Sequence, residues 1–67
     1  MTGLDLRLRR TAKRVKVTDL ARVMEVKHSR VSQIEGTAQV TQRAAAKYLA
    51  ALATFPDVDS AESARAA

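Results

Sequence analysis

The 67-residue chain contains no cysteine and no tryptophan, and it has only one histidine, one tyrosine, one phenylalanine and one proline. Without cysteine there is no disulfide framework, no thiolate zinc site and no thiol nucleophile, and one histidine cannot hold a metal alone. We therefore expect no metal and no cofactor. No apolar run approaches the length of a membrane span, and the N-terminus lacks the apolar core of a signal peptide, so we expect a cytoplasmic protein.

Acidic residues are scarce in most of the chain. Residues 1–55 hold eleven Lys and Arg against four Asp and Glu, or +7, whereas residues 56–67 hold one against three. This balance favours a polyanionic partner, either nucleic acid or an anionic membrane surface. Scattered carboxylates also speak against an enzyme, which needs a nucleophile with a positioned base or a carboxylate pair in a cleft. A chain this short forms one domain at most, and we expect no small-molecule ligand because it can hardly enclose a pocket.

The spacing of apolar residues predicts an all-α, four-helix domain over residues 1–55, because no stretch finds a partner strand. The first expected helix runs from Leu4 to Arg14, with Leu4 and Leu8 at helical spacing. The last should be capped by the Thr41 hydroxyl and end at Pro56. Residues 56–67 form an acidic tail with little to bury, which we expect to be disordered.

Two shorter helices are expected between these two, in the segment from Asp19 to Glu35. The first should begin with Thr18 as its N-cap, because a hydroxyl there accepts a hydrogen bond from the helix backbone. Its apolar side should consist of Leu20, Val23 and Met24. The helical pattern then breaks at residues 25–27, where Val26 is the apolar residue able to fill the corner between the helices.

The second of these helices starts at His28 and has two different faces. Val31 and Ile34 lie on its apolar side. The opposite face carries short, uncharged, polar side chains, namely Ser29, Ser32 and Gln33. Hydroxyls and a carboxamide suit the major groove of DNA, where they can meet base edges. An ordinary corner between two helices fits the same pattern, so the segment alone leaves both interpretations open.

The segment LARVMEVKHSRVSQIEG resembles the core of the Cro/repressor-type (XRE-like) helix-turn-helix family, over roughly residues 4–53. The resemblance is carried by Leu20-Ala21, Val26, the Val31 and Ile34 pair and the Ile34-Glu35-Gly36 ending. It implies a lambda-repressor-like domain in the nucleoid that binds an inverted-repeat operator as a homodimer and regulates transcription. The resemblance makes the helix that starts at His28 the recognition helix, which enters the major groove. Gly36 should end this helix in a left-handed conformation. The family usually has Gly at the inter-helix turn, so Glu25 must either adopt a left-handed backbone at some cost or the turn must differ.

The resemblance and the polar face together predict the contacts with DNA. The expected base-contacting residues are His28, Ser29, Ser32 and Gln33. The expected phosphate-contacting residues are Lys16, Thr18, Lys27, Arg30 and Arg43, of which Arg43 could equally be a solvated surface residue. Glu35 stands between apolar positions and needs a cation if it is buried. The resemblance implies a structural ion pair with Arg10, or with Arg9 after a shift of one residue.

Two other functions fit parts of the sequence. A protein-binding adaptor or antitoxin could use the same helices to grip a partner protein. RNA binding has less support, because Tyr48 and Phe55, the only aromatic residues, sit at core spacing rather than where bases could stack on them. If the protein is a dimer, the apolar candidates for the subunit contact are Leu52, Phe55 and Val58.

Overall fold

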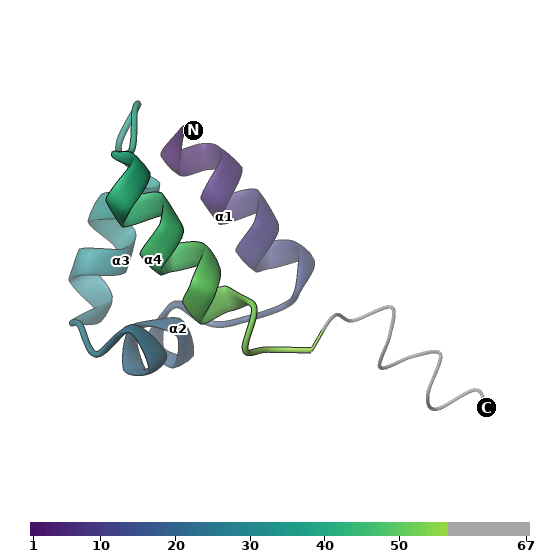
Figure 1. Cartoon of the computed structure of the whole chain (residues 1–67). Helices are drawn as coiled ribbons and strands as arrows, with labels where there is room; N and C mark the ends of the chain where they lie inside the picture. Colours follow the sequence, from purple (N-terminus) through teal and green to yellow (C-terminus); the bar gives the residue numbers. More distant parts are fainter. Residues whose placement is uncertain (57–67) are drawn as a thin grey trace.

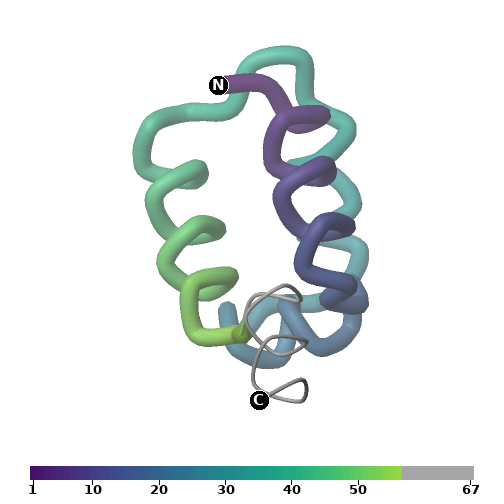
Figure 2. The backbone as a smooth tube through the Cα atoms, turned by 90° about the vertical axis from the view of Figure 1, so that its right-hand side faces the viewer, coloured from purple at the N-terminus to yellow at the C-terminus, as the bar shows by residue number. Residues whose placement is uncertain are grey.

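The computed structural model describes residues 1–56 (Figure 1). Within them, four helices follow one another: α1 (Gly3–Ala12), α2 (Val17–Met24), α3 (His28–Glu35) and α4 (Gln42–Leu52). They form a compact all-α domain, which confirms the expected fold class. Figures 1 and 2 show α1 and α4 side by side, with the short α2 beneath them near the end of α4. The predicted acidic tail, apart from Pro56, lies outside the described residues.

The four helices do not all pack against one another. Helix α1 packs against α3 and α4, and α2 packs against the same two helices, whereas the backbones of α3 and α4 come close to each other in few places. The core between them contains Leu6, Leu20, Val31 and Tyr48 as its largest fully buried side chains. Burying a side chain of this size contributes about 1.5–3 kcal/mol, so these residues hold the four helices together. No helix in the described part of the chain has the length and apolar character needed to cross a bilayer.

Helix α1 buries a different face from the one expected. Leu6 is fully buried, whereas Leu4 and Leu8 are 59% and 58% exposed. Residues four apart lie on the same side of a helix, so the rotation that buries Leu6 also turns Arg10 towards the interior. The spacing of Leu4 and Leu8 was therefore a poor guide to the buried face.

Local interactions set both ends of α1. At its start, the Thr2 hydroxyl accepts a hydrogen bond from the Asp5 backbone (3.1 Å), and the Thr2 backbone donates to the Asp5 carboxylate (3.2 Å). This capping box begins the helix at Gly3. At its end, Arg14 adopts a left-handed φ of 56°, so the predicted extension to Arg14 was wrong. Val15, after this turn, is buried in the core.

Gly3 permits the close contact between the start of α1 and the end of α3. Its backbone N–H donates to the Thr37 carbonyl oxygen at 2.8 Å. A Cβ atom at this position would lie 2.4 Å from the backbone oxygens of both Ile34 and Glu35. Only glycine fits there, because backbone atoms cannot move aside as the end of a flexible side chain can.

Helix α2 begins two residues earlier than expected. Lys16 is its N-cap and makes no side-chain capping bond, so Thr18 lies inside the first turn and the prediction of a Thr18 cap was wrong. Leu20 and Met24 are buried as expected, but Val23 is 43% exposed. An eight-residue helix packed against two neighbours buries only a narrow face, and here that face includes Ala21 rather than Val23.

The turn between α2 and α3 resolves the question raised by the missing glycine. Glu25 is left-handed, with φ 59° and ψ 41°. The Val26 backbone N–H then donates to the Ala21 carbonyl at 3.0 Å, and the Val26 side chain packs against the core. Gly36, by contrast, ends α3 with a φ of −87°, so the predicted left-handed glycine there was wrong. The left-handed position precedes α3 instead of following it.

Helix α4 starts as predicted and ends earlier. The Thr41 hydroxyl accepts a hydrogen bond from the Ala44 backbone at 3.2 Å. The helix ends at Leu52, four residues before Pro56, and the Lys13 ammonium donates to the backbone oxygens of Leu52 and Phe55. Leu52 is only 3% exposed, so it belongs to the core rather than to a subunit contact.

The other two residues predicted for a subunit contact are Phe55 and Val58. Phe55 is half-buried against the core of its own domain. Val58 lies outside the described residues. The large apolar side chains that are exposed in the described part are Met1, Leu4, Leu8 and Val23.

The left-handed backbone of Glu25 predicts the effect of restoring glycine. We expect Glu25→Gly to stabilise the domain by about 0.5–1 kcal/mol and to raise the Tm by a few degrees, because glycine adopts this conformation without strain. Thermal unfolding followed by circular dichroism measures the change. Glu25→Ala is the matched control: it removes the same charge but keeps the strain, so its Tm should not rise. Equal gains in both variants would contradict a backbone cause.

Candidate nucleic-acid interface

The exposed face of α3 has the composition that the sequence predicts. Val31 and Ile34 are buried. The side chains of His28, Ser29, Ser32 and Gln33 are all exposed. Helix α3 has no acidic residue in its first turn, and its one carboxylate, Glu35, is 7% exposed in an ion pair at the other end. The outward face of α3 can therefore offer hydrogen bonds without presenting a negative charge.

The predicted phosphate-contacting side chains lie at helix starts and are all exposed. Lys16 and Lys27 directly precede α2 and α3, and Arg43 lies in the first turn of α4. Thr18 lies in the first turn of α2 and Arg30 in the first turn of α3. Because the N–H groups of a first helical turn lack partners within the helix, all five residues lie where a backbone can meet an anion.

Two hollows flank α3 and show how these residues are grouped. On one side, Ser32 shares a hollow with Val17, at the start of α2, and with Arg7 of α1. On the other side, Arg30 shares a groove with Arg43 and Lys47 of α4. The polar face of α3 therefore has cations from other helices beside both of its edges. Arg7 and Lys47 were not predicted, because the spacing of residues within α1 and α4 does not indicate which of their cations lie beside α3.

One hydrogen bond links the groove to the polar face. The Arg30 guanidinium donates to the Gln33 side-chain oxygen at 3.1 Å. This bond orients the amide of Gln33, so its NH₂ group is left to donate. Arg30 thus contributes both to the cationic edge of α3 and to the orientation of a neighbouring polar side chain.

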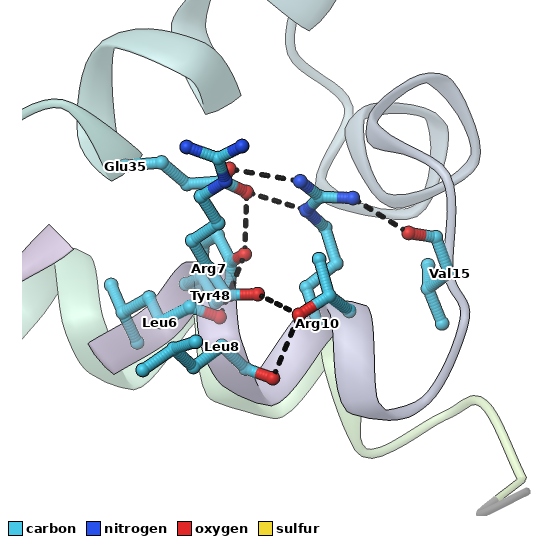
Figure 3. A network of polar contacts seen from close by, with 8 residues as sticks. Leu6, Arg7, Leu8, Arg10, Val15, Glu35 and Tyr48 are labelled. Atoms are coloured by element: carbon cyan, nitrogen blue, oxygen red, sulfur yellow. Dashed lines mark hydrogen bonds and ion pairs between the residues drawn. The ribbon is translucent and has the colours of Figure 1, made fainter. Parts of the chain in front are cut away.

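The predicted ion pair holds α3 against α1 (Figure 3). The Arg10 guanidinium makes two bonds to the Glu35 carboxylate, one from Nε at 2.7 Å and one from Nη2 at 3.1 Å. Its Nη1 donates to the Val15 backbone oxygen at 2.8 Å. The partner is Arg10, as in the first of the two alternatives, and Arg9 is exposed. The side chains of Arg10 and Glu35 are only 12% and 7% exposed, so water contributes little to their solvation.

Tyr48 adds a third helix to this pair. Its hydroxyl lies 2.7 Å from Glu35 Oε2 and 3.2 Å from the Leu6 backbone oxygen. A tyrosine hydroxyl has one hydrogen, and the closer, charged acceptor makes the stronger bond. The spacing of Tyr48 predicted its place in the core but not this bond, because no local pattern indicates which buried acceptor a distant hydroxyl meets.

The environment of Glu35 keeps its carboxylate charged. Burial alone would raise the pKa of Glu35, but the hydrogen bonds from Arg10 and Tyr48 and the charges of Arg10 and Arg7 outweigh it and hold that pKa below its usual value. Burial and the hydrogen bond to Glu35 raise the pKa of Tyr48 well above the ordinary value. At neutral pH the Glu35 carboxylate is therefore ionised and the Tyr48 hydroxyl is protonated, so their hydrogen bonds stay intact.

The fold and the site together define a small, basic, all-α domain with one exposed polar helix face between cationic edges. Among residues 1–56, no group of His, Cys, Asp and Glu could hold a metal ion. No protein-family model, curated protein or solved structure matches the chain. The relationship to helix-turn-helix regulators therefore stays a prediction from the residues.

The buried ion pair predicts a stability difference that depends on pH. Glu35→Gln leaves a guanidinium without its counter-charge and should destabilise the domain by about 3 kcal/mol at pH 7. Because the folded-state pKa of Glu35 is lowered, its stabilising effect is complete above the pKa of a free glutamate and is lost as pH falls through the folded-state value. The difference in the free energy of unfolding between the wild type and Glu35→Gln should therefore become smaller below about pH 4.3.

Denaturant unfolding at several pH values measures this difference. Arg9→Gln is the control, since it removes an exposed cation from the same helix and should change stability by less than about 0.5 kcal/mol. If Glu35→Gln has the same free energy of unfolding as the wild type at pH 7, the ion pair contributes nothing to the stability of the fold.

Proposed function

We propose that this protein is a sequence-specific, double-stranded-DNA-binding regulator of transcription. In this proposal α2 and α3 form a helix-turn-helix unit of the Cro/repressor type, and α3 is the recognition helix. The observation that carries the proposal is the exposed, uncharged polar face of α3 with cations beside both edges. A nucleoid location in the cytoplasm and the absence of catalysis belong to the same proposal.

The arrangement fits the geometry of a duplex. The major groove admits one α-helix, and the phosphates of the two strands lie on either side of it. With α3 in the groove, Ser29 and Gln33 would face base edges, while Arg30 and Arg43 would approach one strand. Lys16 and the start of α2 would approach the other. Phosphate contacts of this kind set the position of the helix, and the polar side chains supply the sequence preference.

A homodimer on an inverted-repeat operator extends the proposal. A two-fold dimer repeats the recognition helix, so the half-sites should have centres about 10 base pairs apart. Because Leu52 is buried and Phe55 is half-buried, the exposed Leu4 and Leu8 of α1 replace them as candidates for the subunit contact. A selection from a random DNA library with the purified protein tests the proposal and determines the half-sites together.

The same exposed leucines favour one second candidate function. Exposed apolar patches can mark a surface that binds another protein, and Leu4 and Leu8 are both exposed and lie four apart on one helix face. The alternative is therefore an antitoxin or adaptor whose α1 grips a partner protein. This alternative predicts that the library selection yields no preferred DNA sequence.

Binding to duplex DNA should depend strongly on salt. If Lys16, Lys27, Arg30 and Arg43 each neutralise one phosphate, a dimer makes about eight such contacts, and log K should fall against log salt with a slope near −7. Fluorescence anisotropy of a labelled operator over a range of NaCl concentrations gives this slope. A slope near zero would exclude electrostatic binding to the phosphate backbone.

Truncation of Gln33 should separate recognition of bases from attraction to the backbone. Gln33 carries no charge, so Gln33→Ala should lose about 1–3 kcal/mol on the selected operator and almost nothing on random DNA. Arg43→Ala is the contrasting variant and should weaken both complexes alike. The same anisotropy assay measures the affinities of the wild type and both variants for the two DNAs. Equal losses on both DNAs for Gln33→Ala would exclude α3 as the recognition helix.

A further inference from the structure

The groove beside Arg30 has a mixed chemical character. It runs between α3 and α4, whose backbones come close to each other in few places. Its apolar lining consists of Met24, Val26, Ile34 and Ala44. Three cations, Arg30, Arg43 and Lys47, also line it, and it encloses about 210 Å³. A second hollow continues from it past Ile34 towards residues 37–41.

No carboxylate is among the lining residues of this groove in the described part of the chain. Gathering three positive charges without a counter-charge is unfavourable, because like charges repel each other. An anion inside the groove would relieve this repulsion, and a guanidinium can bind a carboxylate through two parallel hydrogen bonds. The charge of the groove therefore selects an anion, and its apolar lining selects one with an apolar body.

We propose that the groove binds a small aromatic monocarboxylate and that this ligand controls DNA binding. The volume is below the roughly 300–1,000 Å³ of sites for drug-sized ligands, so one ring with one carboxylate is the size that fits. The carboxylate lies against the cations of α3 and α4, and the ring covers Val26 and Ala44. We expected no small-molecule ligand from the sequence, because a chain this short can hardly enclose a pocket, and the spacing of residues along a helix does not indicate a groove between two helices.

Competition with DNA follows from the residues involved, and this step rests on the function proposed above. Arg30 and Arg43 are two of the side chains assigned to phosphates. A carboxylate that engages both removes them from the DNA backbone, and it also draws Arg30 away from the Gln33 side-chain oxygen. The ligand therefore weakens operator binding, as an inducer does for a repressor.

Benzoate is the probe for the site itself, and no DNA is needed for this measurement. Titration should shift the methyl NMR signals of Val26 and Ile34 saturably, with a Kd on the order of 1 mM for a ligand of this size. Acetate lacks the ring and benzamide lacks the charge, so each should bind at least about tenfold more weakly, as expected when one of two contributions is lost. Shifts that do not saturate, or equal binding of acetate and benzoate, would overturn the site.

Two substitutions test the location while leaving Arg30 and Arg43 in place. Ala44→Leu fills the groove and should reduce benzoate affinity at least about tenfold, and Lys47→Gln removes one cation and should reduce it several-fold. Arg9→Gln removes an exposed cation from α1 and should leave the affinity unchanged. Operator binding by Ala44→Leu at the wild-type level shows that this variant is folded. Wild-type benzoate affinity in both groove variants would place the ligand elsewhere.

The regulatory step has its own measurement. At a benzoate concentration ten times its Kd, the apparent operator Kd should rise at least about tenfold relative to the same concentration of acetate, which matches the ionic strength. The operator affinity of Ala44→Leu should not respond to benzoate. Saturable benzoate binding with an unchanged operator Kd would overturn the proposed regulation but would still support the binding site. A protein that binds benzoate but no duplex DNA would overturn the proposed function instead.

Discussion

The buried carboxylate of Glu35 is the constraint on which the rest of the domain depends. A charge that is 7% exposed is costly unless it is paired and hydrogen-bonded, and Glu35 meets this requirement with Arg10 from α1 and Tyr48 from α4. The three side chains come from three helices that are far apart in the sequence. Their bonds are directional, so they specify one arrangement of these helices where apolar packing alone would permit several.

That arrangement determines which faces of the helices remain for function. Placing Arg10 against Glu35 rotates α1 so that Leu6 enters the core and Leu4 and Leu8 stay outside. It also fixes the end of α3 against the start of α1, where Gly3 allows backbone contact. With Val31 inside and Glu35 held at one end, the polar side of α3 can only face outwards. The proposed interface is therefore positioned by contacts on the opposite side of the same helix.

The proposed functions share one side chain that links two parts of the surface. Arg30 lines the groove between α3 and α4 and also donates to Gln33 on the polar face. An anion in the groove and a phosphate on the duplex would compete for the same guanidinium. Regulation by such competition requires no change in the core, because it acts through an exposed side chain with two alternative partners.

Features that depend on neighbours within a turn or two could be predicted from the sequence alone. These are the four helices, the Thr41 cap, the burial of Val31 and Ile34 and the uncharged opposite face of α3. The sequence also indicated a cation for Glu35, because a carboxylate between apolar positions needs one. The tertiary structure alone decided the rest: the buried face of α1, the left-handed Glu25, the Tyr48 bond, the position of Arg7 beside Ser32 and the groove between α3 and α4. Each of these features depends on how separate helices are placed relative to one another. The spacing of residues along one helix does not indicate that placement.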